Sequence, residues 1–401
     1  MRDFRVADES YRWTMLAAAV AIICVSFGIL FSLSVFFGSL EASMKWSRAA
    51  ISSVALVNWI AMGFGSFLWG SLSDRIGTRA VVMIGGGLLG LALVLSSQVT
   101  SFAQFYITFG VMVGLAVGCF YTPLNSTVTR WFSVNRGLAV AIASTGIGLG
   151  VLLVAPLSRW LIEAFGWRVA MLLLGDLAWL LVIPLALLIR NAPETGASSS
   201  SNSAPGLYHS MRTIARTPQF WAIALTHFAC CAAHSGPIFH MVTHVTDQGI
   251  LPMAAATVYG ISGLGSIGGR IVSGISADRF GATRTLIVLL GLQAAIIGFY
   301  LVTRDLLSFY LLGLSFGVAY GGVMPLYALV TRDYFGDRVM GTAFGAVFFV
   351  SCLGMGLGSF SGGWFYDHLG TYTWLFGTSV MIGTAAWLVA LTIRPKAALP
   401  V

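Results

Sequence analysis

The sequence predicts an all-α membrane protein whose twelve transmembrane helices form two sets of six. The 401-residue chain is 57% hydrophobic and only 9% charged, with a mean hydropathy of +0.87, whereas soluble domains carry about 25% charged residues. Apolar runs of about 20 residues, the length that crosses a bilayer core, recur along the chain. One polar, low-complexity stretch separates two groups of these runs. A soluble multidomain enzyme, a disordered chain and a collagen-like chain are therefore excluded.

The apolar runs fall on either side of a single linker. The first six cover residues 13–40, 47–72, 80–99, 102–129, 137–162 and 167–190. The second six cover residues 218–246, 253–277, 285–303, 306–331, 341–366 and 371–393. The segment between them contains the run Gly-Ala-Ser-Ser-Ser-Ser-Asn-Ser, which is typical of a flexible linker. We therefore expect an N-terminal bundle over 1–190, a cytoplasmic linker over 191–217 and a C-terminal bundle over 218–401.

The distribution of basic residues predicts the orientation in the membrane. An even number of spans places both termini on one side, and that side then holds 16 Lys and Arg residues against 5 on the other. Because short cytoplasmic loops are enriched in Lys and Arg, both termini are predicted to be cytoplasmic in the inner (plasma) membrane. The run 13–40 is longer than the apolar part of a signal peptide, so we expect an uncleaved first helix.

Several classes of site and partner are not expected. The basic residues occur singly or in pairs between apolar runs, without the clustering that nucleic-acid binding requires. All five cysteines lie inside apolar runs and form no CxxC pair, so neither a disulfide framework nor a zinc site is predicted. We expect no cofactor and no metal, and a monomer in contact with the lipid bilayer.

Two loops repeat at a fixed distance. Residues 70–79 read GSLSDRIGTR and residues 274–284 read GISADRFGATR, an offset of 204 residues. Pro123 and Pro325, in the fourth and tenth predicted spans, are 202 residues apart. Proline removes a backbone hydrogen-bond donor and kinks a helix, so matched prolines predict matched kinks. Interrupted helices at equivalent positions in two halves point to a transporter's binding site.

With two copies of this loop and six helices on each side of a linker, the whole chain resembles the major facilitator superfamily. The resemblance implies two bundles that rock around a central site to give alternating access. It also implies that four loop residues make gating contacts on the cytoplasmic side: Asp74, Arg75, Asp278 and Arg279. The alternative is that these charges only anchor short loops.

Four further segments are similar to the bacterial monocarboxylate and oxalate/formate transporter group within that superfamily. They are Trp46-Ser47-Arg48, Arg130-Trp131-Phe132, the run from Cys230 to His240 and Gly268-Gly269-Arg270. This resemblance implies a small organic anion as substrate.

Arg270 is the strongest single candidate for substrate binding. An arginine within a membrane span costs at least about 2.5 kcal/mol on insertion scales and usually faces a cavity or a partner. Ser262, Ser266 and Ser273 share its helical face. A guanidinium binds a carboxylate through two parallel hydrogen bonds. The alternative is a structural arginine bound to backbone carbonyls or extended toward the membrane surface.

Other candidates for substrate binding lie in the spans that line the cavity in the resembling transporters. Tyr320 and Tyr327, seven residues apart, share a helical face, and Tyr121 precedes Pro123 by two residues. The resemblance implies that such tyrosines bind the substrate, whereas a buried tyrosine more often serves packing. Three apolar residues match cavity positions of the same transporters and suit a short apolar tail: Leu30, Ile147 and Cys352.

Proton coupling requires a group that titrates. Asp247 lies near the outer end of the seventh span and shares a helical face with His244 and His240. Histidine titrates near neutrality, and burial moves a carboxylate toward it. The resemblance implies that the acid at this place couples the proton, with His240 as a second candidate and Asp176 as a rival. The alternative is a water-exposed aspartate with packed histidines, the role we expect for His227 and His234.

The charge inventory favours a monocarboxylate. Oxalate/formate exchangers carry a lysine in the eleventh span, but residues 341–366 contain no Lys, Arg or His. One buried cation balances one carboxylate, since a second charge would stay unpaired in a low dielectric. Conversely, animal monocarboxylate transporters have an aspartate at the position of Ser266, so their proton path does not transfer.

The predicted function is proton-coupled symport of a small monocarboxylate such as lactate or pyruvate. The first alternative is an efflux or antiport carrier for other organic anions or drugs, and the second is a non-transporting receptor with the same fold. An enzyme is not expected because the chain contains no HExxH or Walker motif. Its GxSxG match at 313–317 lies inside a predicted span, without the strand-to-helix turn that exposes a nucleophile.

Overall fold

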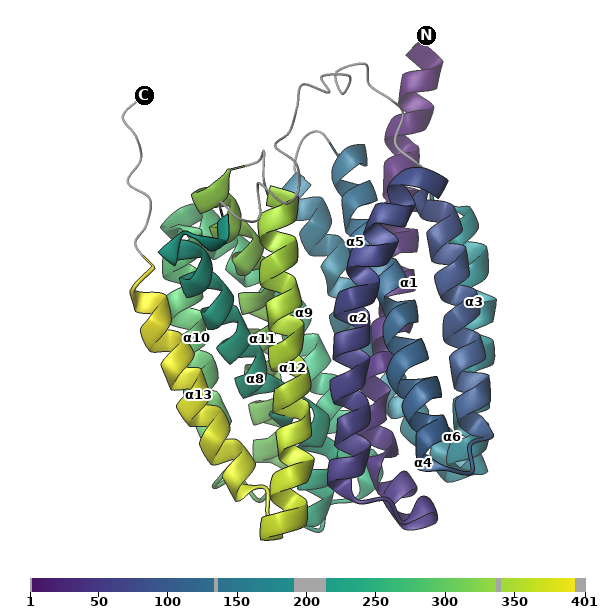
Figure 1. The fold of residues 1–401 in the computed structure, drawn as a ribbon, viewed down its shortest axis with the longest axis vertical. Helices are drawn as coiled ribbons and strands as arrows, with labels where there is room; N and C mark the ends of the chain where they lie inside the picture. Colours follow the sequence, from purple (N-terminus) through teal and green to yellow (C-terminus); the bar gives the residue numbers. More distant parts are fainter. Residues whose placement is uncertain (1, 133–135, 191–213, 337–339, 394–401) are drawn as a thin grey trace.

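The computed structural model describes residues 2–132, 136–190, 214–336 and 340–393, and all the regular structure in these ranges is helical (Figure 1). The first half of the molecule contains α1 (Arg2–Met44), α2 (Arg48–Ile76), α3 (Thr78–Ser97), α4 (Phe102–Phe105), the π-helical η1 (Tyr106–Val113), α5 (Gly114–Trp131) and α6 (Arg136–Leu187). The second half contains α8 (Pro218–Asp247), α9 (Pro252–Phe280), α10 (Ala282–Phe299), α11 (Leu306–Phe335), α12 (Met340–Leu369) and α13 (Thr373–Leu391). Most of the predicted linker, residues 191–213, lies outside the described residues.

The helices correspond to the apolar runs of the sequence. Within the described ranges, ten helices are long and apolar enough to cross a membrane. One of them, α6, contains two predicted spans, because Gly166 interrupts it with a φ of 80°. The helix α9 is not among the ten, because its serines, glycines and Arg270 lower its hydropathy. The described chain thus contains helices for all twelve predicted spans.

The helices run side by side along the long axis of the molecule (Figure 1). The start of α1 and the end of α13 lie at the same end, drawn at the top of Figure 1, which we call the upper end. The opposite, lower end contains the α1–α2, α8–α9 and α12–α13 connections. Many large apolar side chains remain exposed on the outer surface, among them Phe67, Leu180 and Val288, each at least 64% exposed. Such a surface is suited to lipid rather than to water.

The repeated loops adopt the same backbone conformation. Gly77 ends α2 and begins α3 with φ 87° and ψ 149°, and Gly281 ends α9 and begins α10 with φ 88° and ψ 145°. A positive φ of this kind is readily adopted only by glycine. The sequence repeat at an offset of 204 residues is therefore also a structural repeat between the two halves.

Glycines bring α9 and α11 into close contact beside Arg270. A Cβ on Gly265 or Gly269 of α9 would overlap backbone atoms of Leu314 or Val318 on α11. Gly317 of α11 faces the backbone of α9 in the same way. Small residues at membrane helix contacts let backbones approach and gain van der Waals packing. Arg270 is thus carried on a helix that is tightly fixed against its neighbour.

We expect Gly269→Ala to destabilise the protein far more than Gly268→Ala. The added Cβ at Gly269 meets the Val318 carbonyl, whereas a Cβ at Gly268 has no atom within 4 Å. Overpacking of this kind typically costs about 1–3 kcal/mol. The melting temperature in detergent should fall by several degrees for the first variant and stay near that of the wild type for the second. Equal melting temperatures for the two variants would contradict the described packing.

The two halves also contact each other through close helix pairs. Gly356 and Gly363 of α12 face Leu56 and the Arg48 carbonyl of α2, and Gly148 of α6 faces Gly263 of α9. These contacts place α2 on α12 and the first span of α6 on α9. These four helices therefore meet where the two halves join, and one of them, α9, carries Arg270.

Candidate functional site

Arg270 is a buried cation without a matching anion. Its side chain is on α9 and the residue is only 2% exposed. Nη1 donates to the Ser266 carbonyl at 3.1 Å and contacts the Ser266 hydroxyl, while Nε has no partner. Within the described residues, no carboxylate forms an ion pair with this guanidinium. A buried charge is stable only when it is paired, so this position is electrostatically suited to an entering anion.

Two of the predicted tyrosines lie within electrostatic range of the guanidinium. Tyr121 on α5 and Tyr320 on α11 are the phenols close enough to interact electrostatically with Arg270. The Tyr320 hydroxyl also lies near the hydroxyls of Ser262 and Ser266. Because α5 belongs to the first half and α11 to the second, the structure brings Arg270, Tyr121 and Tyr320 together between the halves.

Aromatic rings enclose Tyr121 from both halves. Its ring contacts Phe27 of α1 edge-on at 5.7 Å and stacks on Phe348 of α12 at 5.5 Å with an interplanar angle of 17°. Asn125 donates to the Tyr121 carbonyl at 2.8 Å, so its amide nitrogen is used within the helix. The Tyr121–Phe348 stack is a direct contact between the halves beside Arg270, and Phe348 was not foreseen from the sequence.

The apolar candidates lie around the same region. Cys352 on α12 is buried and close enough to interact with Tyr121, and a Cβ on Gly63 of α2 would lie 3.3 Å from its Cβ. Leu30 is buried on α1, one turn after Phe27. Ile147 is half-buried on α6 and precedes Gly148, which packs against α9. These three residues come from three different helices, α1, α6 and α12.

Tyr327 is separated from this group. Its ring stacks on His227 of α8 at 3.8 Å, and its hydroxyl donates to the Thr226 carbonyl at 3.2 Å. Seven helical residues span about 10.5 Å, so Tyr327 lies about that much closer to the upper end than Tyr320. Its hydroxyl is thus engaged inside the second half in this arrangement.

At the lower end, Arg48 joins the two halves through an ion pair with Asp247. Its Nη1 lies 2.7 Å from Asp247 Oδ2 and its Nη2 lies 3.2 Å from Oδ1. Its Nε is 3.1 Å from Glu41 Oε2. Its guanidinium lies over the Tyr366 ring, 3.7 Å from the centroid. A planar guanidinium that binds a carboxylate through two bonds gives a strong, oriented contact.

Asp367 strengthens this junction at the start of α2. Its carboxylate accepts hydrogen bonds from the backbone N–H groups of Arg48 at 3.1 Å and Ala49 at 2.7 Å. These groups lie at a helix N-terminus, where unsatisfied N–H donors and the helix dipole favour an anion. Asp367 is on α12 in the second half, so a second carboxylate joins the two halves.

His240 on α8 lies next to this junction and also contacts both halves. Its Nε2 lies 3.2 Å from Ser52 Oγ and 3.0 Å from the Ser359 carbonyl, and its Nδ1 lies 3.0 Å from the Tyr372 hydroxyl. Ser52 already donates to the Arg48 carbonyl, so Nε2 carries the proton and Nδ1 accepts from Tyr372. Contacts from both halves therefore hold the His240 ring in place.

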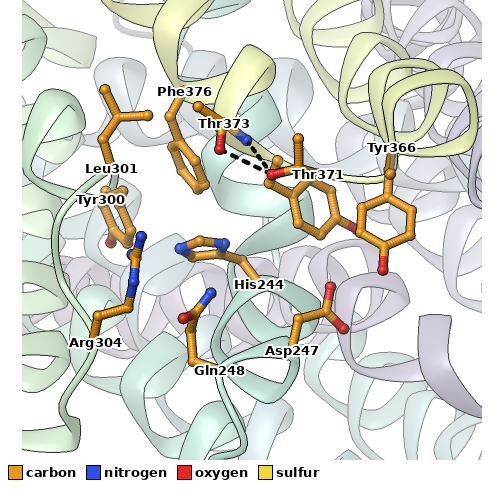
Figure 2. A pocket seen from close by; sticks show the side chains of 12 residues that line it. His244, Asp247, Gln248, Tyr300, Leu301, Arg304, Tyr366, Thr371, Thr373 and Phe376 are labelled. Atoms are coloured by element: carbon orange, nitrogen blue, oxygen red, sulfur yellow. Dashed lines mark hydrogen bonds between the residues drawn. The ribbon is translucent and has the colours of Figure 1, made fainter.

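A pocket opens beside Asp247 at the lower end (Figure 2). Its volume is about 250 Å³, and α8, the α10–α11 connection and the α12–α13 connection supply its lining. Figure 2 shows the His244 ring in the middle of the view, with Gln248 and Asp247 close by and Arg304 beside Tyr300. The Asp247 side chain is 29% exposed, while that of Arg48 is 9% exposed. Asp247 is thus reachable by water although it is paired with Arg48.

The predicted gating residues lie at the upper end. Arg75, Asp278 and Arg279 are exposed near the ends of α2 and α9. The side chain of Asp74 lies outside the described residues. Asp176, the rival proton site, is exposed on α6 and is not part of the junction around Arg48.

The sequence did not reveal the partners of Arg48. Asp247, Asp367 and Tyr372 are distant from it in the chain, and each is unremarkable alone. One signal was available: Arg48, Asp247 and Asp367 all fall at span ends on the same predicted side of the membrane. Opposite charges at one level of a bundle are candidates for pairing.

Three features are typical of a membrane carrier that binds its solute between two helical halves. They are the helical bundle, the buried cation between its halves and the ion pairs at one end. The model of the Major Facilitator Superfamily matches residues 15–359. The chain belongs to the Major Facilitator Superfamily, and it is a transporter rather than an enzyme.

Individual relatives and solved structures agree with this family. Monocarboxylate transporter 13 of Bos taurus is 30% identical over 91% of this chain and 85% of its own length. The oxalate:formate antiporter of Oxalobacter formigenes is 26% identical over 87% of this chain and 84% of its own. The nucleoside transporter NupG covers 96% of this chain and 99% of its own with a TM-score of 0.76 at 12% identity. A bacterial homologue of the lysosomal transporter Spinster, in an inward-facing unoccupied conformation, gives a TM-score of 0.74 at 17% identity, covering 97% and 99%. The predicted fold class is confirmed.

Proposed function

We propose that the protein carries a small monocarboxylate, such as lactate or pyruvate, together with a proton by alternating access. The observation that carries this proposal is Arg270, a buried guanidinium between the halves that no described carboxylate balances. A bound carboxylate would supply the missing charge and the second half of a bidentate contact. The similarity to monocarboxylate transporter 13 supports the same class of substrate.

The surroundings of Arg270 favour a substrate with one carboxylate and a short tail. Tyr121 and Tyr320 offer hydroxyl groups beside the guanidinium, and Leu30, Ile147 and Cys352 offer apolar surface. Tyr327 would join the site only if α11 moved relative to α8, since its hydroxyl is bound to the Thr226 carbonyl. A dicarboxylate would bring a second negative charge, and the other buried arginine, Arg48, is already paired with Asp247 and Glu41.

The proposed carrier works as a monomer in the inner (plasma) membrane with both termini in the cytoplasm. The upper end is then cytoplasmic and the lower end faces outward, as the excess of basic residues favours. The moving units are the bundles 1–190 and 218–401, joined by the cytoplasmic linker 191–217. Gating contacts on the cytoplasmic side involve Asp74, Arg75, Asp278 and Arg279.

The proton acts on the junction that closes the lower end. Ionised Asp247 pairs with Arg48 across the halves, so its charge stabilises the closed arrangement. A protonated Asp247 is neutral and attracts Arg48 less, which favours opening. His240 is the second candidate for the proton, because its ring contacts Ser52 of the first half and Tyr372 of the second. Acid on the outer side therefore favours access from that side.

Exchange of organic anions is the second candidate function. The similarity to the oxalate:formate antiporter favours it. An exchanger needs no proton, because each bound anion neutralises Arg270 in both directions. Proton-coupled symport and exchange therefore differ in whether a pH gradient alone drives accumulation.

We expect purified protein in liposomes to accumulate radiolabelled L-lactate when the outside is made acidic. With a gradient of about two pH units, the internal concentration should exceed the external one by at least tenfold before it decays. Collapse of the gradient with a protonophore should abolish this accumulation, while lactate added on both sides at equal pH should still exchange. Accumulation that survives the protonophore would contradict symport, and exchange without accumulation would favour the antiporter.

A further inference from the structure

Four buried rings form a ladder between α8 and α11. His234 stacks on Tyr320 with centroids 5.8 Å apart at 27°, and His227 stacks on Tyr327 with centroids 3.8 Å apart at 13°. Both histidines are 1% exposed. The rungs are seven residues apart on each helix, as expected for two helices that run in opposite directions. The ladder begins beside the substrate site, because Tyr320 also adjoins Arg270.

Packing alone does not account for histidine at these positions. Both ring nitrogens of His227 lack a hydrogen-bond partner among the described residues, as does the Thr226 hydroxyl. His234 Nδ1 lies 3.8 Å from the Cys230 sulfur, and its ring also interacts with the Cys230 backbone, one turn earlier on the same helix. A buried imidazole with unsatisfied nitrogens costs more than the phenylalanine that would fill the same space. Ionisable residues within a membrane span are therefore functional candidates.

The groups around His234 make its protonation sensitive to whether an anion is bound at Arg270. The titratable or charged groups that surround it, directly or through Tyr320, are Cys230 and His227 on α8, Tyr320 on α11, Cys352 on α12 next to Cys231, and Arg270 on α9. On α10 the neighbour is the neutral Gln293, which contacts Cys230. None of these groups is a carboxylate. A proton on His234 would therefore be a second buried positive charge in this half while Arg270 stands alone.

We propose that His234 is the group that holds the proton in the closed, substrate-loaded state. A carboxylate on Arg270 neutralises the first positive charge, so that a proton on His234 becomes acceptable one side chain away across Tyr320. Because coupling is reciprocal, a protonated His234 raises the affinity for the carboxylate. This assignment rests on the proposed function and adds to it: Asp247 and His240 control the lower end, and His234 holds the proton that accompanies the anion.

Proton uptake on substrate binding tests the assignment. Purified protein in weakly buffered detergent receives L-lactate, and a pH-indicator dye reports the protons that are taken up. The wild type should take up a proton for each lactate bound, with an affinity that improves as the pH falls from 8 to 6. His234→Gln should reduce the uptake at least fivefold and flatten the pH dependence of the affinity. His234→Phe, which keeps a ring against Tyr320, should do the same.

Two further variants make the result decisive. Asp247→Asn should retain the proton uptake, because this carboxylate is in the junction at the lower end. His368→Gln is the matched control, since His368 also stacks on an aromatic ring, Trp364 at 4.4 Å, but is exposed on α12. Uptake that is lost in Asp247→Asn, or retained in His234→Gln, overturns the assignment, and the first result does so even if the His234 variants fail to fold. A wild type that binds lactate without a proton instead refutes the proposed symport itself.

Discussion

Arg270→Lys should reduce the initial rate of L-lactate uptake into liposomes at least 100-fold, although the positive charge is kept. Lysine presents a compact ammonium group without the planar fork that binds both carboxylate oxygens. At position 270 the Ser266 carbonyl already takes one donor, at 3.1 Å, and a shorter reach would leave the carboxylate with fewer partners. A 100-fold loss corresponds to about 2.7 kcal/mol, which is within the range of a charged hydrogen bond that is lost in a buried site.

The control for this substitution is Arg159→Lys. Arg159 forms an ion pair with Glu163 at 2.8 Å, four residues along α6, where the Glu163 side chain is 41% exposed. Exposed pairs contribute little, so uptake should stay within about twofold of the wild type. Lactate binding by the purified variants separates loss of the site from loss of motion. Uptake by Arg270→Lys within threefold of the wild type would refute the role of Arg270 in binding.

The fold was predictable because its determinants are local. A run of about 20 apolar residues specifies a span without reference to any other part of the chain. The repeated loops at 70–79 and 274–284 specified the relation between the halves, and Gly77 and Gly281 adopt matching conformations. The break at Gly166 was also predictable, since the apolar runs on either side end at 162 and begin at 167.

The site was predictable only where one residue is anomalous by itself. Arg270 stands out in any apolar run, because the membrane makes a lone charge costly. Tyr320 and Tyr327 show the limit of such reasoning. They share a helical face, yet Tyr320 adjoins Arg270 while Tyr327 stacks on His227. Helical periodicity gives the face of a residue, but the partner depends on the neighbouring helix at that depth.

The junction at the lower end depends on long-range pairing, which no local pattern encodes. Arg48 and Asp247 are 199 residues apart. Each has an ordinary charge at a span end, and only the docking of α2 against the second half makes them partners. The contacts of His240 with Ser52 and Ser359 are of the same kind.

Asp247→Asn should favour opening of the lower end. In the wild type, ionised Asp247 holds Arg48 through two contacts of 2.7 and 3.2 Å. Asparagine carries no charge to attract Arg48, so the fraction of molecules open at the lower end should rise. A shift of at least tenfold in the equilibrium, about 1.4 kcal/mol, is expected because breaking a partly buried ion pair usually costs more than this.

Spin labels on either side of the junction measure this opening. Ala42 and Leu251 are exposed at the lower end of the first and second halves, and Leu251 is 75% exposed. Each is replaced by cysteine in a Cys24→Ser background, because Cys24 is the one native cysteine that is not buried. Electron paramagnetic resonance then gives the distance distribution of the wild type and of each variant, without substrate.

Glu163→Gln provides the matched control for Asp247→Asn. It also removes one carboxylate from an ion pair, with Arg159, but both partners of that pair lie on α6 and it cannot join the halves. Its open fraction should therefore match that of the wild type. If Asp247→Asn instead stays as closed as the wild type, another contact must hold the junction. His240 is then the first to test, because its ring contacts Ser52, Ser359 and Tyr372. Opening only in a His240→Gln variant would show that this imidazole, and not the ion pair, holds the lower end closed.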